Sequence, residues 1–252
     1  MDSIKGYEGH TWAPDIIYYK GNYHLFYSCS AFGKNTSAIG HAYRRTLNPD
    51  SDEPWTDTGA VIVSHARDNF NAIDPNIVID EEGNPWMTFG SFWGGIQLVR
   101  LTEDLTSTLK PEKLYTICTR QFEGASDVPS RSVNSVEAPF IFKHGDYYYL
   151  FVSYEFCCRG LKSDYKVVVG RSTRVTGPYV DKDGRELTRG GGSLVVDSND
   201  EFVAIGHSAA YHFDGKDYFM AHGYSRSEDG ASKLFFREMT WDEEGWPFVS
   251  AE

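Results

Sequence analysis

The chain has 252 residues, 40% of them hydrophobic and 15% aromatic, and its 24 Lys and Arg against 36 Asp and Glu leave a net charge of −12. This charge argues against a nucleic-acid backbone or an anionic membrane as the partner and is compatible with a neutral ligand. No apolar run approaches the roughly 18 to 20 residues of a membrane span. Residues 1–10 have neither the basic start nor the apolar stretch of a signal peptide. We therefore expect a sizeable core and no visible targeting signal, and the sequence leaves the compartment open.

Four similar segments follow one another along the chain. Each starts with an apolar run, turns at a glycine, continues in an aromatic strand and adds a third and a weaker fourth strand. The turn glycines are Gly21, Gly83, Gly145 and Gly215, at intervals of 62, 62 and 70 residues. Four antiparallel strands repeated at this interval predict the blades of a β-propeller, and a sandwich with accidental self-similarity is the alternative.

The fold that we predict is all-β and consists of a single β-propeller domain over residues 1–252. Its predicted strands are rich in aromatic and β-branched residues, which favour sheets, and glycines mark the turns between them. The predicted blades cover approximately residues 10–65, 70–118, 134–190 and 204–252.

Residues that precede the predicted inner strands are the candidates for a site. The inner strands of a propeller line its central channel, and their entry ends open on one face. In chain order, the residues there include Trp12, Asn71, Asp74, Glu137 and His207. We expect these side chains, two carboxylates among them, to meet at one funnel. The alternative is that each acid is a solvated charge at the start of a strand.

Two acids at a channel mouth suit the cleavage of a glycosidic bond. One carboxyl group protonates the leaving oxygen, while another activates water or attacks the sugar. Aromatic faces hold sugar rings, and the candidates here, each with core packing as the alternative, are Trp12, Phe32, Phe92 and Trp93. His207 is either a hydrogen-bonded channel histidine or a residue that holds an ion.

Two further segments are predicted as loops. The longest runs over residues 116–134 and returns the chain to Glu137, and loops of this length are usually functional or mobile. The glycine-rich residues 189–193 either let the backbone approach a ligand or make a tight turn. They lack the Lys-Ser/Thr pair of a phosphate loop, so the sequence does not predict a nucleotide site there.

The four cysteines are too few for a disulfide framework. Cys29, Cys118, Cys157 and Cys158 also lack the CxxC spacing of a zinc site. Adjacent cysteines can pair only through a strained ring, so we expect buried free thiols at Cys157 and Cys158.

Several long, ordered motifs run through the chain. They include Trp12-Ala13-Pro14-Asp15, Asn71-Ala72-Ile73-Asp74-Pro75, Phe89-Gly90-Ser91-Phe92-Trp93-Gly94-Gly95, Glu137-Ala138-Pro139-Phe140 and Gly190-Gly191-Gly192-Ser193. Together they resemble glycoside hydrolase family 43, and closely the endo-1,5-α-L-arabinanases within it. The resemblance extends over essentially the whole chain.

The resemblance implies a five-bladed β-propeller that cleaves α-1,5-linked L-arabinan internally, with inversion of configuration. Glu137 matches the general acid, and Asp74 matches the acidic residue that raises the pKa of that acid and orients it. His207 matches a histidine near the axis that is associated with calcium or another ion, and no organic cofactor is implied. The positions that match substrate-lining residues are Trp12, Phe32, Asn71, Ser91, Phe92, Trp93 and Gly94.

One part of the family's pattern is missing. The family's general base is an aspartate in a His-Asp-Pro motif of the first blade, and this sequence contains no His-Asp-Pro. Four of the five blades are recognisable, so we expect either a shortened enzyme or self-association that completes the ring. The alternatives are a non-catalytic arabinan-binding propeller and an exo-acting arabinofuranosidase or β-xylosidase on the same fold.

Overall fold

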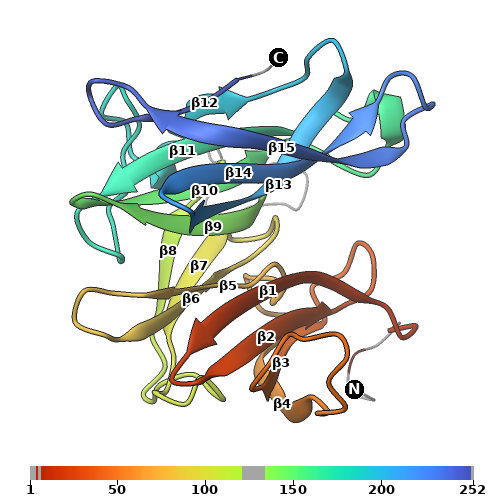
Figure 1. Cartoon of the computed structure of the whole chain (residues 1–252), viewed down its shortest axis with the longest axis vertical. Coiled ribbons are helices and arrows are strands. Elements are labelled where there is room, and N and C mark those ends of the chain that lie inside the picture. Colours follow the sequence, from red (N-terminus) through yellow and green to blue (C-terminus); the bar gives the residue numbers. More distant parts are fainter. Residues whose placement is uncertain (1–3, 5–6, 121–133, 251–252) are drawn as a thin grey trace. The chain divides into compact units, whose positions relative to one another are not determined.

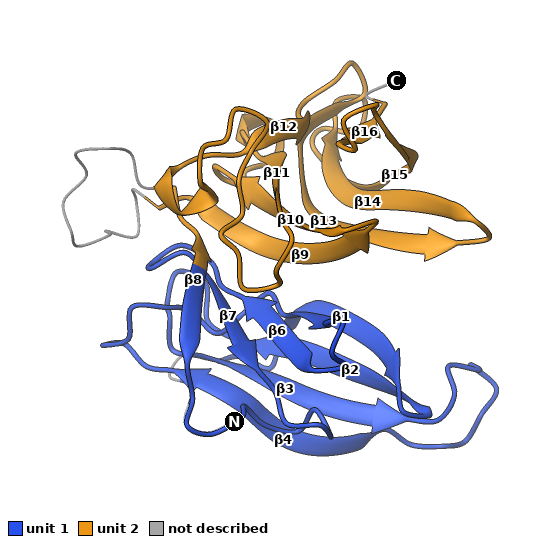
Figure 2. Cartoon of the chain, turned by 90° about the vertical axis from the view of Figure 1, so that its left-hand side faces the viewer, with its two compact units in different colours: residues 1–116 blue, residues 117–252 orange. Residues whose placement is uncertain are grey.

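The computed structural model describes residues 4, 7–120 and 134–250, and there the chain is all-β (Figure 1). Its strands form antiparallel sheets of four strands each, in which the strands follow one another in chain order. The sheets divide between two compact units, residues 1–116 and 117–252 (Figure 2). The four-stranded meanders confirm the prediction of propeller blades.

The first unit contains two sheets, and the last strand, β8, carries the chain into the second unit. The strands are β1 (Thr11–Tyr19), β2 (Asn22–Cys29), β3 (Ser37–Arg44), β4 (Thr56–Ser64), β5 (Asn76–Ile79), β6 (Pro85–Phe89), β7 (Ile96–Arg100) and β8 (Leu114–Cys118). The core of this unit joins side chains of both sheets, among them Phe26, Ile39, Met87 and Phe89. Burying each such side chain stabilises the fold by about 1.5–3 kcal/mol.

The second unit also contains two sheets. Their strands are β9 (Val136–His144), β10 (Tyr147–Tyr154), β11 (Lys166–Ser172), β12 (Ser193–Val196), β13 (Phe202–Phe213), β14 (Lys216–Ser225), β15 (Ser232–Trp241) and β16 (Pro247–Val249). The core again lies between the two sheets, with Phe151, Phe219, Phe235 and Trp246 among its buried members. Two short 3-10 turns, η1 (Gly160–Lys162) and η2 (Leu187–Arg189), interrupt the loops. Of the predicted loop at 116–134, residues 121–133 lie outside the described part of the chain.

The turns between the first and second strands of the sheets confirm the repeat. All four predicted turn glycines have φ between +53° and +88°, a region that residues with a side chain rarely adopt. No helix in the described residues is long and apolar enough to cross a membrane.

The glycine-rich segment before β12 is a tight turn. A Cβ on Gly191 would lie 2.5 Å from the backbone oxygen of Arg185, and one on Gly192 would lie 2.7 Å from Cγ2 of Val168. The oxygen of Gly191 accepts a hydrogen bond from the Tyr154 hydroxyl. The glycines are therefore required by close internal packing, which confirms the tight turn, and the approach of a ligand to this backbone stays a prediction.

The expectation of free thiols at the adjacent cysteines is wrong. Cys157 and Cys158 form a disulfide in the loop between β10 and β11, where Cys158 has φ +69°. This backbone turn, which a sequence pattern does not reveal, lets the two neighbouring side chains meet. Cys29 and Cys118 are free and buried.

One face of the last sheet carries apolar side chains that remain exposed. On β15, Leu234 and Phe236 are 71% and 46% exposed, while Phe235 between them is fully buried. The Phe236 ring stacks on Tyr218 of β14, with ring centroids 5.2 Å apart. Tyr211, Phe213 and Phe248 are also exposed in this sheet. We call these residues the β13–β16 face.

Candidate active site

The backbone kinks in the inner strand, or two residues before it in the case of β5, where the sequence places its candidate residues. Ala13, Asp74, Ala138 and His207 all have positive φ, between +41° and +58°. Such backbone is uncommon for residues other than glycine and costs about 1–3 kcal/mol each. The pairing register shifts beside the kinks in β1, β9 and β13, and a bulge of this kind re-aims the side chains of its strand. The kinks therefore set the directions of Trp12, Glu137 and their counterparts.

Two of these kinks are each stabilised by a buried serine of the preceding sheet. The hydroxyl oxygen of Ser28 accepts a hydrogen bond from the backbone N–H of Asp74 at 3.0 Å. In the second unit, Ser153 does the same for the N–H of His207 at 2.8 Å. Both serines are fully buried. Within each unit, the second strand of one blade thus fixes the mouth of the next inner strand.

Asn71 and Asp74 of the first unit are buried rather than solvated. The Asn71 side-chain oxygen accepts a hydrogen bond from the Ser37 hydroxyl at 2.6 Å, and Ser37 in turn contacts Ser30 at 2.7 Å. Asp74 is only 6% exposed. A charged group at the surface would remain in water, so the alternative of a solvated strand-start charge is wrong for Asp74.

The segment from Ser91 to Gly94 is held in an unusual backbone conformation. Phe92 and Trp93 both have positive φ, and both side chains are half-buried. Gly94 follows, and its N–H donates to the backbone oxygen of Asn69 at 3.0 Å. A Cβ on Gly94 would lie 2.2 Å from that oxygen, so only glycine fits there. Ser91 is buried.

The two other aromatic candidates of the first unit differ in exposure. Phe32 is 79% exposed in the loop between β2 and β3, which excludes the alternative that its ring packs in the core. Trp12 lies in β1 beside the kink and is half-buried. Both rings leave surface that a sugar could stack against.

Glu137 lies in β9 and contacts a residue that the sequence did not single out. The Tyr165 hydroxyl donates a hydrogen bond to Oε1 of Glu137 at 2.7 Å. Tyr165 precedes β11 and is fully buried. Its ring fits because residue 206 is glycine: a Cβ on Gly206 would lie 2.1 Å from Cδ1 of Tyr165. No motif marks Tyr165, because its role depends on contacts between separate strands.

His207 lies near Glu137, and His222 lies beside His207; burial favours the neutral form of both rings. Burial lowers the pKa of His207, although the charge of Glu137 acts in the opposite direction. Burial, and then the charge of His207, lower the pKa of His222 to about 4. Their ring centroids are 6.5 Å apart. Neutral imidazoles at pH 7 can accept hydrogen bonds or bind a metal.

Among the described residues, His207 is not part of a group of side chains that could hold a metal ion. Calcium takes about six to eight oxygen ligands, and the described residues contain no group of three or more His, Cys, Asp or Glu that could hold a metal ion. The ion at His207 stays a prediction.

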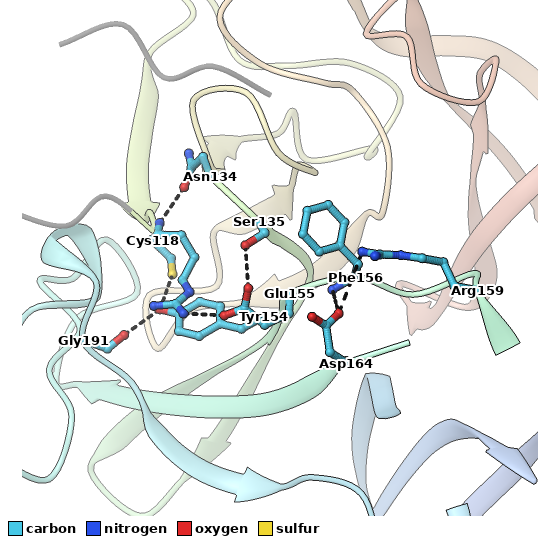
Figure 3. Close-up of polar contacts among 10 residues, drawn as sticks. Cys118, Asn134, Ser135, Tyr154, Glu155, Phe156, Arg159, Asp164 and Gly191 are labelled. Atoms are coloured by element: carbon cyan, nitrogen blue, oxygen red, sulfur yellow. Dashed lines mark hydrogen bonds and ion pairs between the residues drawn. The ribbon is translucent and has the colours of Figure 1, made fainter. Parts of the chain in front are cut away.

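A polar cluster fixes the residues directly before Glu137 (Figure 3). The Glu155 carboxylate accepts a hydrogen bond from the Ser135 hydroxyl at 3.0 Å and forms an ion pair with Arg120. The N–H of Glu155 donates to the backbone oxygen of Ser135 at 3.0 Å. The start of β9, two residues before Glu137, is therefore tied to the end of β10 by side-chain and backbone bonds.

Comparison with known proteins identifies the family. A profile of glycosyl hydrolases family 43 matches residues 2–247. The chain belongs to this family. This family 43 chain is 49% identical, over 96% of its length and 71% of the relative, to the extracellular exo-α-(1→5)-L-arabinofuranosidase ArbA of Cellvibrio japonicus. It is 40% identical, over 97% of its length and 70% of the relative, to the extracellular endo-α-(1→5)-L-arabinanase 1 of Bacillus subtilis.

Solved structures agree with this assignment. The α-L-arabinanase of Cellvibrio cellulosa in complex with arabinohexaose superposes with a TM-score of 0.92 at 49% identity, covering 97% of this family 43 chain and 78% of that one. An exo-1,5-α-L-arabinanase from a bovine ruminal metagenomic library has the same TM-score at 50% identity, covering 99% and 81%. The family 43 chain spans about 70% of the length of the curated relatives named above.

The prediction that Asp74 and Glu137 share one funnel involves both units and stays a prediction, as do the catalytic and substrate-lining roles of the individual residues. Each unit by itself contains an inner strand with a kink at its start, where a serine from the neighbouring sheet binds the backbone N–H of Asp74 or His207. In the second unit, the carboxyl of Glu137 is oriented by a tyrosine and lies near His207, whose pKa is lowered by burial.

Proposed function

We propose that this chain hydrolyses α-1,5-linked L-arabinan, cleaving it internally with inversion of configuration. The observation that carries the proposal is the 40–49% identity to arabinan-cleaving enzymes over almost the whole chain. The oriented carboxyl of Glu137 supports it, because a general acid must be held in one direction to protonate a leaving oxygen.

In the proposed reaction, Glu137 gives its proton to the glycosidic oxygen of the leaving arabinan segment, and Asp74 orients that acid. An inverting enzyme also needs a base that activates water on the opposite face of the sugar, with the two carboxyl groups roughly 6.5–9.5 Å apart. The His-Asp-Pro motif that resembles this base in the family is not in the sequence. Turnover by these 252 residues alone therefore requires another carboxylate to act as the base.

Two other functions have support of their own. Exo-acting cleavage is favoured by the names of the two most similar proteins described above, at 49% and 50% identity. Non-catalytic arabinan binding is the reading for these 252 residues by themselves, which contain no His-Asp-Pro motif. Chromatography of the products released from debranched arabinan separates the three. Internal cleavage gives mixed oligosaccharides from the start, exo action gives one short product, and a binding protein gives none while calorimetry still detects arabinohexaose.

The half-buried Trp12 gives a direct test of the sugar site. We expect Trp12→Ala to weaken arabinohexaose binding about tenfold, since one aromatic face contributes on the order of 1 kcal/mol or more. Calorimetric affinities of Trp12→Ala and of Trp55→Ala, a half-buried tryptophan outside the candidate site, provide the comparison. Unchanged affinity together with a lower melting temperature in the Trp12 variant would place this ring in the core.

We also retain the proposal of an ion near His207, held by one imidazole and otherwise by water. Titration of calcium chloride into chelator-treated wild-type and His207→Gln proteins tests it. If neither protein gives a heat of calcium binding, the proposal is contradicted.

We further propose that copies of this chain associate through the β13–β16 face. Apolar patches of this kind commonly mark interaction surfaces. We expect Phe236→Lys to shift sedimentation towards the monomer, because it places a charge in the middle of the apolar face. Leu47→Lys, which changes an exposed leucine of the first unit, serves as the control. A wild-type protein that is monomeric at every concentration contradicts the proposal.

A further inference from the structure

The loop between β10 and β11, residues 155–165, contains the Cys157–Cys158 disulfide and ends on Tyr165. Cys157 is half-buried and packs against a small cluster of buried residues that includes Tyr165 and Tyr224. The N–H of Cys158 donates to the Tyr224 hydroxyl at 2.7 Å. The disulfide turn is therefore attached to the cluster by both packing and a hydrogen bond.

The same cluster positions the tyrosine that contacts the acid. The Tyr165 ring is enclosed by the cluster on one side and by the backbone of Gly206, which admits no Cβ, on another. The His222 ring lies 5.9 Å from it. With its ring enclosed in this way, the hydroxyl of Tyr165 has a defined place, 2.7 Å from Oε1 of Glu137.

The loop is also tied to itself (Figure 3). Phe156 donates its N–H to the Asp164 carboxylate at 3.0 Å, and Asp164 returns a backbone bond to the oxygen of Phe156 at 3.1 Å. The N–H of Arg159 donates to the Ser163 hydroxyl at 3.0 Å. These bonds join the residues on either side of the disulfide to Ser163 and Asp164, the two residues directly before Tyr165.

We propose that the Cys157–Cys158 disulfide and Tyr165 form a positioning device for the carboxyl of Glu137, and that reducing the disulfide slows cleavage. This inference rests on the proposed function. Cys158 is exposed, so a dithiol can reach it. The S–S bond breaks and two S–H bonds form, while the dithiol becomes a cyclic disulfide and supplies both electrons and both protons.

The carboxyl oxygen that accepts from Tyr165 acts as the carbonyl-type oxygen of the protonated acid. The acid proton is therefore directed to the other oxygen, Oε2. Loss of the Tyr165 hydroxyl removes one bond that fixes the direction of this carboxyl, so the proton is less often directed at the leaving oxygen. We therefore expect slower proton donation with little change in substrate binding.

Steady-state kinetics test this with the whole chain. Tyr165→Phe, Cys157→Ser/Cys158→Ser and dithiothreitol-treated wild type should each lower kcat on arabinohexaose about tenfold at constant KM, as expected for one lost hydrogen bond to an acid. With 2,4-dinitrophenyl α-L-arabinofuranoside, whose leaving group needs no proton, the rates should stay at the wild-type level. Dithiothreitol should have no further effect on the double serine variant.

Tyr179→Phe is the matched control, because Tyr179 is also buried in the second unit and its hydroxyl donates to the backbone oxygen of Val175 at 2.8 Å. It should leave both kinetic constants unchanged. A loss of rate that is equal for both substrates would show a general structural effect and overturn the positioning role.

A second measurement does not require turnover. In protein carrying ¹³C-labelled glutamate carboxyls, the Glu137 resonance is the one that disappears in Glu137→Gln. It should shift in Tyr165→Phe and on reduction of wild type, and should stay in place in Tyr179→Phe. Such shifts in a protein without turnover would support the inference while the proposed function fails. If wild type is active and neither its kcat nor its Glu137 resonance changes when the disulfide is reduced, the proposed role of the disulfide is overturned.

Discussion

Replacing Glu137 by Gln is expected to lower arabinan hydrolysis by about 10²–10⁴-fold, the range that general acid catalysis contributes. The amide has almost the same volume as the carboxyl group and cannot release a proton. Its oxygen can still accept the hydrogen bond from Tyr165, so the local structure should survive. Binding of arabinohexaose, measured by calorimetry, should therefore remain within a few fold of wild type.

The measurement is the rate at which reducing ends appear from debranched arabinan. Glu243→Gln, a substitution of an exposed glutamate in the turn before β16, provides the control for loss of a carboxylate as such. Full activity in the Glu137 variant would remove this residue from the mechanism. Loss of both activity and binding would indicate that Glu137 supports the structure of the second unit.

The blades could be predicted because their signals are local. An apolar run, a turn glycine and an aromatic strand recur four times in the sequence. All four turn glycines adopt a positive φ, a conformation for which glycine is the usual residue. Each of these features depends on a few neighbouring residues. A single sequence therefore predicts the number of sheets and the order of their strands.

The details of the candidate site depend on distant contacts and could not be predicted. The kink at Asp74 is held by Ser28, 46 residues earlier, and Glu137 is oriented by Tyr165, 28 residues later. The sequence pattern gave no reason to pair these residues. The disulfide was missed because its formation depends on the backbone turn at Cys158.

Asp15 shows how a residue inside a motif can have a structural role. It follows Pro14 in β1 and is only 7% exposed. Its carboxylate accepts hydrogen bonds from the N–H of Ile77 at 2.8 Å and from the side chain of Asn76 at 3.3 Å. Asp15 thus joins the first strands of two neighbouring sheets. This structural role explains an acid at that position without any part in catalysis.

A buried pair of histidines in the first unit makes stability depend on pH. His24 Nε2 donates to the backbone oxygen of Tyr19 at 3.2 Å, because a carbonyl can only accept. Its Nδ1 is then the acceptor for Nε2–H of His41 at 2.9 Å. His41 Nδ1 lies 2.7 Å from the Thr58 hydroxyl oxygen, and this hydroxyl also contacts the backbone oxygen of His41 at 3.1 Å, to which it can donate. Because the two facing ring nitrogens hold only one proton between them, the two rings cannot both be charged in this arrangement.

Burial lowers the pKa of His24, and burial together with the charge of His24 lowers the pKa of His41 to about 4. Since an unfolded histidine titrates near 6.5, the unfolded chain binds more protons than the native one below that pH. The free energy of unfolding should be greatest above pH 6.5 and should fall as the pH drops towards 4. The shift of His41 alone corresponds to about 3 kcal/mol once the pH is below 4.

Urea unfolding at pH 7.0, 5.5 and 4.5 measures this dependence. We expect His41→Phe to be less stable than wild type at pH 7.0, because His24 and Thr58 lose a hydrogen-bond partner. Its free energy of unfolding should nevertheless change less between pH 7.0 and 4.5, since one of the groups that must be protonated is gone. His65→Gln, at an exposed histidine of the same unit, should keep the wild-type slope. Equal slopes in wild type and His41→Phe would show that the buried pair does not control the acid sensitivity of this fold.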